Sequence, residues 1–358
     1  MIRRNAASRC RMRMLAAVLA AAAAAPLKPA SAQTDTNNLP LFSDSSTLQL
    51  RLEAPLRALR RDSQRSRPER DGFIRYTDTD GNEVVLEVEV RVRGRSRLAE
   101  CDFPPLRLDF RRRQLDGTIL EGQNRLKLVT LCKSRDSYRD YVHLEHDVYR
   151  LLNVLTDYSF RVRNVDMEYV STDSRREEIL REPAFLIETD QEVAARHGLE
   201  VLEQESFRPE ELDSRHAALV SVFQFIIGNT DWSMLDAPGN EDCCHNADVI
   251  GNNASPAIAL PYDFDQSGLI STEYARPPEM LRIRNVRQRV YRGVCDVNAE
   301  LDIVYTHIAN KRTDLEYVLQ VSKASESARN EALAYLKEAL DILADPQLRN
   351  AAITEQCR

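Results

Sequence analysis

The chain has 358 residues, and 43% of them are hydrophobic, which is enough to form one large domain or two smaller ones. Its 49 basic and 56 acidic residues give a formal net charge of −7. An acidic chain argues against nucleic acid and against anionic membrane surfaces as partners.

Residues 1–32 have the pattern of a secretory signal peptide. Several arginines precede a short, alanine-rich run from Met14 to Ala25, and Ala30-Ser31-Ala32 is a cleavage site of small residues. The apolar run is too short to span a bilayer; the alternative is an uncleaved anchor. Cleavage leaves 43 basic against 56 acidic residues, a net charge of −13. We therefore expect a secreted or periplasmic protein that is not inserted in a membrane after cleavage.

Six cysteines follow the signal peptide, and an even number in an exported protein favours disulfide bonds. We expect Cys101 to pair with Cys132, because both follow strand-like segments that would be neighbours in one sheet. Cys243 and Cys244 would then pair with distant partners such as Cys295. The alternative is a metal site that uses Cys243, Cys244 and His245, but the chain lacks the Cys-x-x-Cys pair typical of such sites.

The first half of the mature chain has the two-residue alternation of half-buried strands. Strand-like segments lie at 48–60, 72–92, 106–110, 124–131, 161–170 and 184–188, with an Asp-Gly turn inside the second. Tyr138–Leu155 instead has an apolar stripe at helical spacing. Residues 33–190 therefore indicate an N-terminal, sheet-rich lobe that is mainly antiparallel and contains one helix.

Residues 191–358 are mostly helical by the same criterion, with apolar stripes at 209–227, 299–321 and 326–344. Loops rich in acidic and amide side chains follow the first of these helices. A sheet with one helix, then a short strand, then a helical half is the element order of a bilobed kinase. We therefore predict an α+β, bilobed, protein-kinase-like fold, with the N-terminal sheet lobe at 33–190 and a C-terminal helical lobe at 191–358.

The stretch Phe223–Gly268 carries the candidate site. Two apolar segments there end in acidic and amide side chains, so these groups would be held at the edge of the core. Asp231, in the turn after the first segment, is the candidate for orienting or deprotonating a hydroxyl. Asn246, Asp263 and Asp265 supply oxygen ligands suited to Mg²⁺ or Mn²⁺, and such ions suit phosphates. The alternative is an acidic turn without a metal.

Three further residues are candidates for holding a nucleotide. Lys127 lies in a strand and Glu145 follows on the helix, which is the order required for a strand lysine that pairs with a helix glutamate and reaches phosphate oxygens. Lys133, at the end of the same strand, competes with Lys127. Glu188 ends the short strand before the helical half. For each of them a solvated charge or a simple turn is the alternative.

Several short runs between residues 84 and 270 point to one family. They are Arg93-Gly94-Arg95-Ser96, Pro104-Pro105-Leu106-Arg107-Leu108, Lys127-Leu128-Val129, Tyr149-Arg150-Leu151, Phe185-Leu186-Ile187-Glu188 and the loops of Asp231 and Asp263. With these runs the chain resembles the CotH-type kinase-like proteins, a group of atypical kinases named for a spore-coat protein. The resemblance implies binding of ATP and a divalent metal, with phosphoryl transfer to a protein Ser or Thr.

On that resemblance, Lys127 and Glu145 match the nucleotide pair, Asp231 the catalytic position, and Asn246 and Asp263 the metal positions. The sequence departs from the family in two places. Its only glycine where a Gly-rich phosphate loop is expected follows Arg93, and the insertion between Asp231 and Asn246 is long and holds two cysteines. HipA-like and phosphoinositide-kinase-like folds share the same loop logic and stay open as alternatives.

Two classes of function follow, and they leave open whether the chain is an enzyme. The first is an exported atypical kinase that transfers a phosphoryl group from ATP to a protein Ser or Thr hydroxyl with Mg²⁺ or Mn²⁺. The second is a catalytically inactive binding or scaffold protein of the periplasm or cell envelope, on a kinase-like fold. The missing Gly-rich loop and the scarcity of ATP outside the cytoplasm favour the second. A metal-dependent hydrolase that uses Asp231 and Asp263 is a third hypothesis.

Overall fold

The structure is a computed structural model that describes residues 39–62, 65–94, 96–176, 178–239 and 243–358. The predicted signal peptide at 1–32 lies outside the described residues. None of the described helices combines the length and the apolar character that a membrane span requires.

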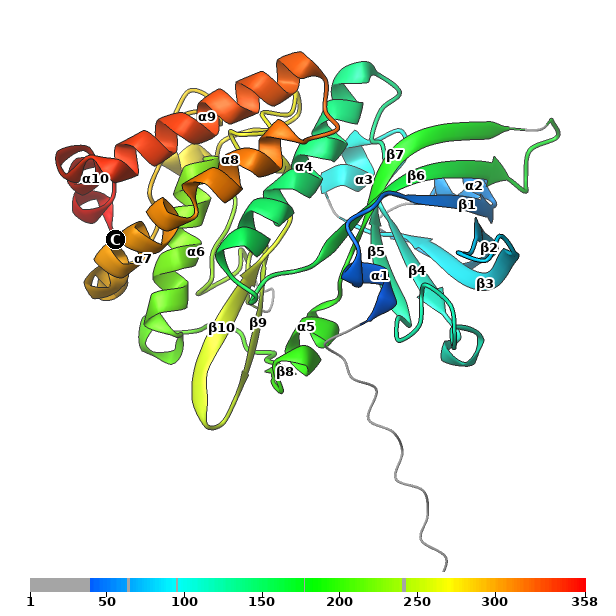
Figure 1. Ribbon diagram of the computed structural model, residues 1–358, viewed down its shortest axis with the longest axis horizontal. Coiled ribbons are helices and arrows are strands. Elements are labelled where there is room, and N and C mark those ends of the chain that lie inside the picture. Colours follow the sequence, from blue (N-terminus) through cyan, green and yellow to red (C-terminus); the bar gives the residue numbers. More distant parts are fainter. Residues whose placement is uncertain (1–38, 63–64, 95, 177, 240–242) are drawn as a thin grey trace, which may run out of the picture. The chain divides into compact units, whose positions relative to one another are not determined.

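Seven strands of the described chain form a closed barrel in the order β1-β2-β3-β4-β5-β7-β6 (Figure 1). Their bounds are β1 Leu48–Ala54, β2 Arg70–Thr77, β3 Glu83–Val92, β4 Leu106–Phe110, β5 Arg125–Val129, β6 Val162–Ser171 and β7 Ile179–Ile187. Neighbouring strands are antiparallel except β1 and β6. These two run parallel, with Leu48 opposite Val165 and Ala54 opposite Ser171, and their pairing closes the barrel.

The alternation that predicts the strands also fills the barrel. In β3 every second residue from Leu86 to Val92 is buried, while Glu87 and Glu89 between them are exposed. The inward side chains of all seven strands form one apolar cluster. Burying a Val or Leu side chain fully is worth roughly 1.5–3 kcal/mol, so this cluster holds the barrel together.

The predicted fold class was wrong. The sheet is a closed barrel of mixed strand direction and not the open sheet lobe of a bilobed, protein-kinase-like fold. The alternation in 48–54 states which side chains point inward, but it does not state which strand lies next to them. The edge that an open sheet would leave free is instead paired with β6, which follows far later in the chain.

The described chain has ten α-helices. They are α1 Pro40–Ser43, α2 Leu56–Leu59, α3 Ser96–Glu100, α4 Asp136–Leu155, α5 Asp190–Arg196, α6 Ser214–Ile227, α7 Leu301–Asn310, α8 Arg312–Gln320, α9 Glu326–Ala344 and α10 Pro346–Ala352. The helix predicted at 326–344 forms with those ends. The one predicted at 299–321 is two helices that meet at Lys311, and the one predicted at 209–227 begins later, where the Asp213 side chain accepts the backbone N–H of His216.

Helix α4 joins the barrel to the other helices. It packs against β6 and β7 on one side and against α8 and α9 on the other (Figure 1). Helix α6 is buried around most of its circumference, and it contacts α7, α9 and β10. A second apolar cluster fills the space among these helices. The elements that carry the candidate site residues are therefore attached to one core.

The second half also contains a sheet, which the sequence did not predict. Strands β8 Glu200–Val201, β9 Ala247–Asn252 and β10 Ser255–Pro261 pair in the order β10-β9-β8. Val249 and Ile250 pair with Ala259 and Ile258 across the β9–β10 hairpin. This hairpin brings the segments before β9 and after β10 to the same end, and those segments hold the acidic and amide residues of the candidate site.

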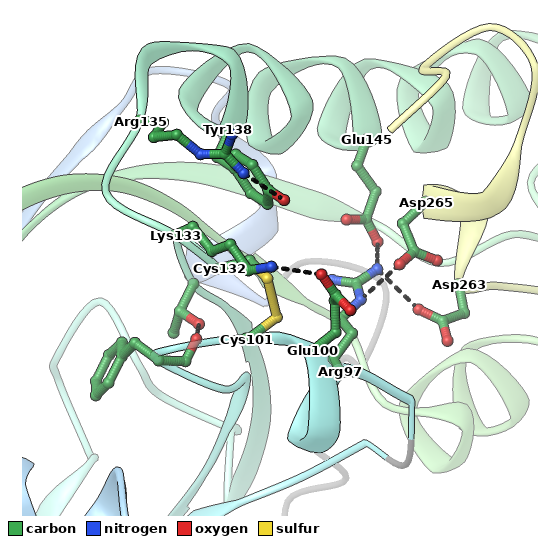
Figure 2. The surroundings of a disulfide bond; sticks show 12 residues. Arg97, Glu100, Cys101, Cys132, Lys133, Arg135, Tyr138, Glu145, Asp263 and Asp265 are labelled. Carbon is green, nitrogen blue, oxygen red and sulfur yellow. Dashed lines mark hydrogen bonds and ion pairs between the residues drawn. A yellow bond between two sulfur atoms is a disulfide. The ribbon is translucent and has the colours of Figure 1, made fainter. Parts of the chain in front are cut away.

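Three cysteine pairs lie at disulfide distance. The predicted pair Cys101–Cys132 is confirmed, with Cα atoms 4.5 Å apart (Figure 2). This disulfide links the residue that follows α3 to the segment that follows β5. The prediction for the other cysteines was wrong: Cys243 pairs with its neighbour in the sequence, and Cys295 pairs with Cys357. Chain folding, and not spacing, decides that Cys295 meets the C-terminal segment.

Candidate functional site

Asp231 lies in the turn that follows α6. Gly228 ends the helix at a φ of +64°, a left-handed conformation that glycine adopts without strain. Both carboxylate oxygens of Asp231 have partners: Oδ1 lies 2.7 Å from His245 Nε2, and Oδ2 accepts from Asn246 Nδ2 at 3.1 Å. The hydrogen bond to Asp231 raises the pKa of His245, although burial acts in the opposite direction. The chain therefore fixes the orientation of this carboxylate.

Asn246 and Asp263 flank the β9–β10 hairpin. Ala247 pairs with Pro261, so the residues just outside the hairpin lie side by side, and Tyr262 donates its backbone N–H to the Asn246 carbonyl at 3.0 Å. Asn246 has a φ of +52° and Asp263 a φ of +58°. A left-handed backbone costs most residues with a Cβ roughly 1–2 kcal/mol, and Asn and Asp adopt it more readily than the others. Strain of this kind is concentrated at functional sites, where the surrounding structure enforces it.

Arg97 is the centre of a buried ion cluster (Figure 2). It comes from α3, and its side chain is only 8% exposed. Nη2 lies 2.7 Å from Glu145 Oε1 and 2.9 Å from Asp263 Oδ1, and Nε lies 2.9 Å from Asp265 Oδ2. One guanidinium thus joins α3 to α4 and to the segment after β10. The Cys101–Cys132 bond fastens the same short helix four residues later.

Three carboxylates around one cation leave an excess of negative charge in a buried place. Burial raises the pKa of Asp265 to about 7; Arg97 opposes this shift, and Asp263 and Glu145 add to it. Burial likewise raises the pKa of Glu145. Burial acts to lower the pKa of Arg97, but the carboxylates raise it well above its usual value. The carboxylates therefore keep Arg97 charged, and burial moves the pKa of Asp265 close to neutral pH.

Lys127 lies beside two aromatic rings and a different carboxylate from the one predicted. Its Nζ is 5.1 Å from the ring centroids of both Phe160 and Tyr262. It is 3.7 Å from Asp248 Oδ2, too far for a hydrogen bond, and burial raises the pKa of Asp248. The expected Lys127–Glu145 pair does not form, because Arg97 takes the glutamate. The Lys127 ammonium therefore lies between the Tyr262 ring and the Asp248 carboxylate.

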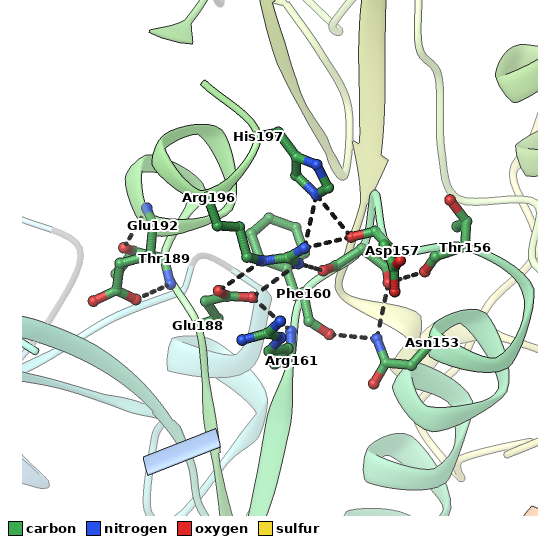
Figure 3. Close-up of polar contacts among 11 residues, drawn as sticks. Asn153, Thr156, Asp157, Phe160, Arg161, Glu188, Thr189, Glu192, Arg196 and His197 are labelled. Atoms are coloured by element: carbon green, nitrogen blue, oxygen red, sulfur yellow. Dashed lines mark hydrogen bonds and ion pairs between the residues drawn. The ribbon is translucent and has the colours of Figure 1, made fainter. Parts of the chain in front are cut away.

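Glu188 is occupied by the chain itself (Figure 3). Its side chain is 2% exposed, with Oε1 3.1 Å from Arg196 Nε and Oε2 accepting the Arg161 backbone N–H at 2.9 Å. It thus connects the end of β7 to the start of β6 and to α5. The nucleotide-binding role predicted for Glu188 stays a prediction, and the structure gives its carboxylate a bracing position.

The other predicted site residues come together. Asp231 contacts Asn246, which is held next to Asp263 through Tyr262. Asp263 reaches Glu145 and Asp265 through the shared guanidinium of Arg97. Lys127 reaches the same segment through the Tyr262 ring. A strand, a helix and loops that are far apart in the sequence therefore place carboxylates, an amide and a lysine at one location.

The oxygen atoms at this location fit a divalent cation in part. Oδ2 of Asp263 and Oδ1 of Asn246 have no hydrogen-bond partner among the described residues, and the Asp263 side chain is 35% exposed. Mg²⁺ is typically held by one or two carboxylates together with phosphate oxygens and water. Asp265 is buried against Arg97. Within the described ranges, no three His, Cys, Asp or Glu side chains form a ligand set.

Sequence reasoning missed two residues of this arrangement. Arg97 directly follows the Arg-Gly-Arg-Ser run of the family resemblance, and Asp248 lies two residues after Asn246. A charged residue in a strand-like or turn-like segment is exposed in most proteins. Nothing in the sequence shows that Arg97 is buried. The one signal in the sequence was the position of Arg97 between a strand-like segment and Cys101, which is predicted to form a disulfide with Cys132.

No protein-family model, no curated protein and no solved structure matches this chain.

Proposed function

We propose that this chain is an exported, metal-dependent phosphotransferase that moves a phosphoryl group from a nucleotide such as ATP to a Ser or Thr hydroxyl of a protein. The observation that supports it is the meeting of Asp231, Asn246 and Asp263 from separate loops, beside Lys127. The proposal rests on the site and not on a kinase fold, because one chemistry can be carried by unrelated folds. The resemblance to the CotH-type proteins stays a prediction.

Asp231 would act on the acceptor. Its two oxygens already accept from His245 and Asn246, but a carboxylate has about four lone-pair positions and can also accept from a hydroxyl. As the hydroxyl oxygen bonds to the terminal phosphorus, the bond from phosphorus to the bridging oxygen breaks. The hydroxyl proton passes to Asp231, and the nucleoside diphosphate leaves.

The donor phosphates would lie between Lys127 and Asp263. Lys127 would place its ammonium on phosphate oxygens. Asp263 and Asn246 would hold Mg²⁺ or Mn²⁺, which when bound neutralises charge on the transferring phosphoryl group. Arg97 would keep Asp263 Oδ2 turned outward, because it already binds Oδ1. Export is supported by the signal-peptide pattern and by cysteine pairs at disulfide distance.

The test separates binding from transfer. Thermal unfolding of the purified protein is followed with Mn²⁺ alone, with ATP alone and with both. Ligand at a hundred times its Kd stabilises the native state by about 2.7 kcal/mol, so both together are expected to raise Tm by several degrees. Asp263→Asn is expected to abolish the shift. Asp231→Asn is expected to keep the shift and to lose transfer of labelled phosphate to casein. An unshifted wild-type protein would rule the proposal out.

One observation favours the second function, a binding protein without catalysis. Arg97 already neutralises part of Asp263 and engages both Glu145 and Asp265, so the carboxylates that would attract a metal are partly satisfied. On this reading Asp263 is a structural link between α3 and the segment after β10. Asp263→Asn would then lower stability in the same way with and without Mn²⁺ and ATP, and neither ligand would move the wild-type melting curve.

A further inference from the structure

A cavity of about 610 Å³ adjoins Asp231 and His245. It is formed by the loop after α6, the segment at 278–280 and the residues around Arg292. Sites that hold a drug-sized ligand range from roughly 300 to 1,000 Å³. Asp231 therefore has an open space of useful size next to it, and this space is separate from the position proposed for the nucleotide, near Lys127.

The wall of the cavity next to Asp231 is largely apolar. Trp232 is only 3% exposed, and its ring is fixed by the bond from Nε1 to the Asn229 carbonyl at 3.1 Å. Leu235 lies further along the same loop, and Met280 on the opposite segment is 75% exposed. An unbranched, flexible methionine at such a position is able to adapt to varied apolar side chains.

The cavity also holds Arg292, which forms no ion pair with a carboxylate in the part of the chain that the structure describes. Arg292 Nη1 donates to the carbonyls of Thr230 and Trp232, but its Nε is buried without a hydrogen-bond partner. Within the described ranges no carboxylate forms an ion pair with Arg292 or with Arg358, which also lines the cavity. Burial, with the charge of Arg358, lowers the pKa of Arg292 to about 10, so it is still charged at neutral pH.

The negative groups of the cavity are already engaged. Asp231 is held by His245, and Asp236 accepts from the Ser233 hydroxyl at 2.5 Å. Both carboxylates act on Arg292 at longer range and oppose the effect of burial on its pKa. The Arg292 guanidinium is half-buried, its Nε has no hydrogen-bond partner and no carboxylate of the described residues forms an ion pair with it, so a carboxylate from a ligand would add a charge-assisted hydrogen bond there.

We propose that this cavity is the acceptor site and binds a peptide segment in which a Ser or Thr is flanked by an acidic and an apolar residue. The acidic side chain meets Arg292, the apolar one packs on Leu235 and Met280, and the hydroxyl faces Asp231. The role as acceptor site rests on the proposed phosphotransferase function; the binding preference itself does not.

The experiment measures binding without nucleotide or metal, so that its outcome is independent of catalysis. The immobilised protein is incubated with an oriented library of N-acetylated peptides that have Ser at the centre and two randomised positions on each side. The bound fraction is then sequenced. We expect Asp or Glu to be enriched roughly tenfold at one position, the factor for one charge-assisted hydrogen bond. Leu, Ile or Met should be enriched at another position.

Two variants test the assignment to this cavity. Arg292→Gln is expected to remove the acidic preference and to keep the apolar one. Met280→Glu, which alters only an exposed side chain, is expected to weaken all acidic peptides. Leu348→Glu is the matched control, because Leu348 lies on α10, is 53% exposed and is not part of the cavity; it should bind as the wild type does. No enrichment, enrichment of Lys or Arg, or an unchanged Met280→Glu variant would overturn the proposal.

Discussion

Arg97 binds Asp263 across 2.9 Å and so connects α3, beside the barrel, to the strained turn that follows β10. The same guanidinium also binds Glu145 of α4 and the buried Asp265. The position of the candidate metal ligand is therefore set by a cation that no motif identifies. Stability and site geometry depend on the same few contacts.

Replacing Arg97 with Met should be strongly destabilising. The substitution leaves Glu145 and Asp265 buried without their cation, and breaking a buried pair in this way costs about 3–5 kcal/mol. The free energy of unfolding, measured in urea, gives the value. Arg57→Met is the control, because Arg57 is 51% exposed and lies 3.8 Å from Glu178; it should cost less than about 1 kcal/mol. An equal loss in the free energy of unfolding for both variants would contradict a stabilising role of Arg97 in the buried ion cluster.

Stability should depend on the protonation of Asp265. Its pKa is raised from 3.8 in the unfolded chain to about 7 in the fold. The folded state therefore binds more protons between these values, and the free energy of unfolding contributed by this group falls as the pH rises from about 4 to about 7. Asp265→Asn should flatten that fall in urea titrations across this range. Asp80→Asn, at an exposed turn, should keep the wild-type slope.

The His245–Asp231 contact should be visible in the titration of the histidine. Its pKa is raised by the hydrogen bond to Asp231. Below its usual pKa of 6.5, His245 is charged and makes its full contribution to the free energy of unfolding. That contribution is lost as the pH rises through the higher pKa that His245 has in the folded state. In Asp231→Asn the pKa of His245, followed by NMR, should move down toward 6.5. A histidine that titrates identically in both proteins would show that the contact does not persist in solution.

The left-handed backbone of Asp263 should be measurable as strain. Asp263→Gly and Asp263→Ala both lose the contact to Arg97, so their difference isolates the backbone. At a φ of +58°, the Gly variant should be the more stable by about 1 kcal/mol. At Glu331, exposed within α9, the order should reverse, because Gly is the poorer helix residue by about 1 kcal/mol. The same order at both positions would contradict the assigned conformation.

The cysteine pairing predicts a peptide map. Digestion without reduction should give linked peptides for Cys101–Cys132 and for Cys295–Cys357. Removing the second pair with Cys295→Ser and Cys357→Ser should cost about 4 kcal/mol, because it frees a loop of 62 residues in the unfolded chain. A linked peptide that joins Cys295 to Cys243 or Cys244 would contradict the structure.

Local patterns in the sequence determined the elements. The alternation of apolar residues in 83–92 indicates a strand, and the apolar stripe in 326–344 indicates a helix. The spacing at which side chains return to one face depends only on the backbone conformation of that segment. For the same reason the turn residues around Asp231 and Asp263 could be recognised as loop ends that carry acidic groups. The Cys101–Cys132 pair was predicted from strand-like segments expected to be neighbours; the pair forms, although Cys101 follows α3 and β4 lies between β3 and β5.

Only the tertiary structure decided what these elements meet. The alternation of side chains in a strand indicates which face is buried, but it does not indicate which strand lies next to it. The parallel pairing of β1 with β6, which closes the barrel, could therefore not be predicted. Ion pairs also depend on contacts between distant parts of the chain. Glu145 binds Arg97 and not Lys127, because α3 places the Arg97 side chain in the core next to Glu145. Which cation lies near a carboxylate depends on distance in space, and a single sequence does not contain that distance.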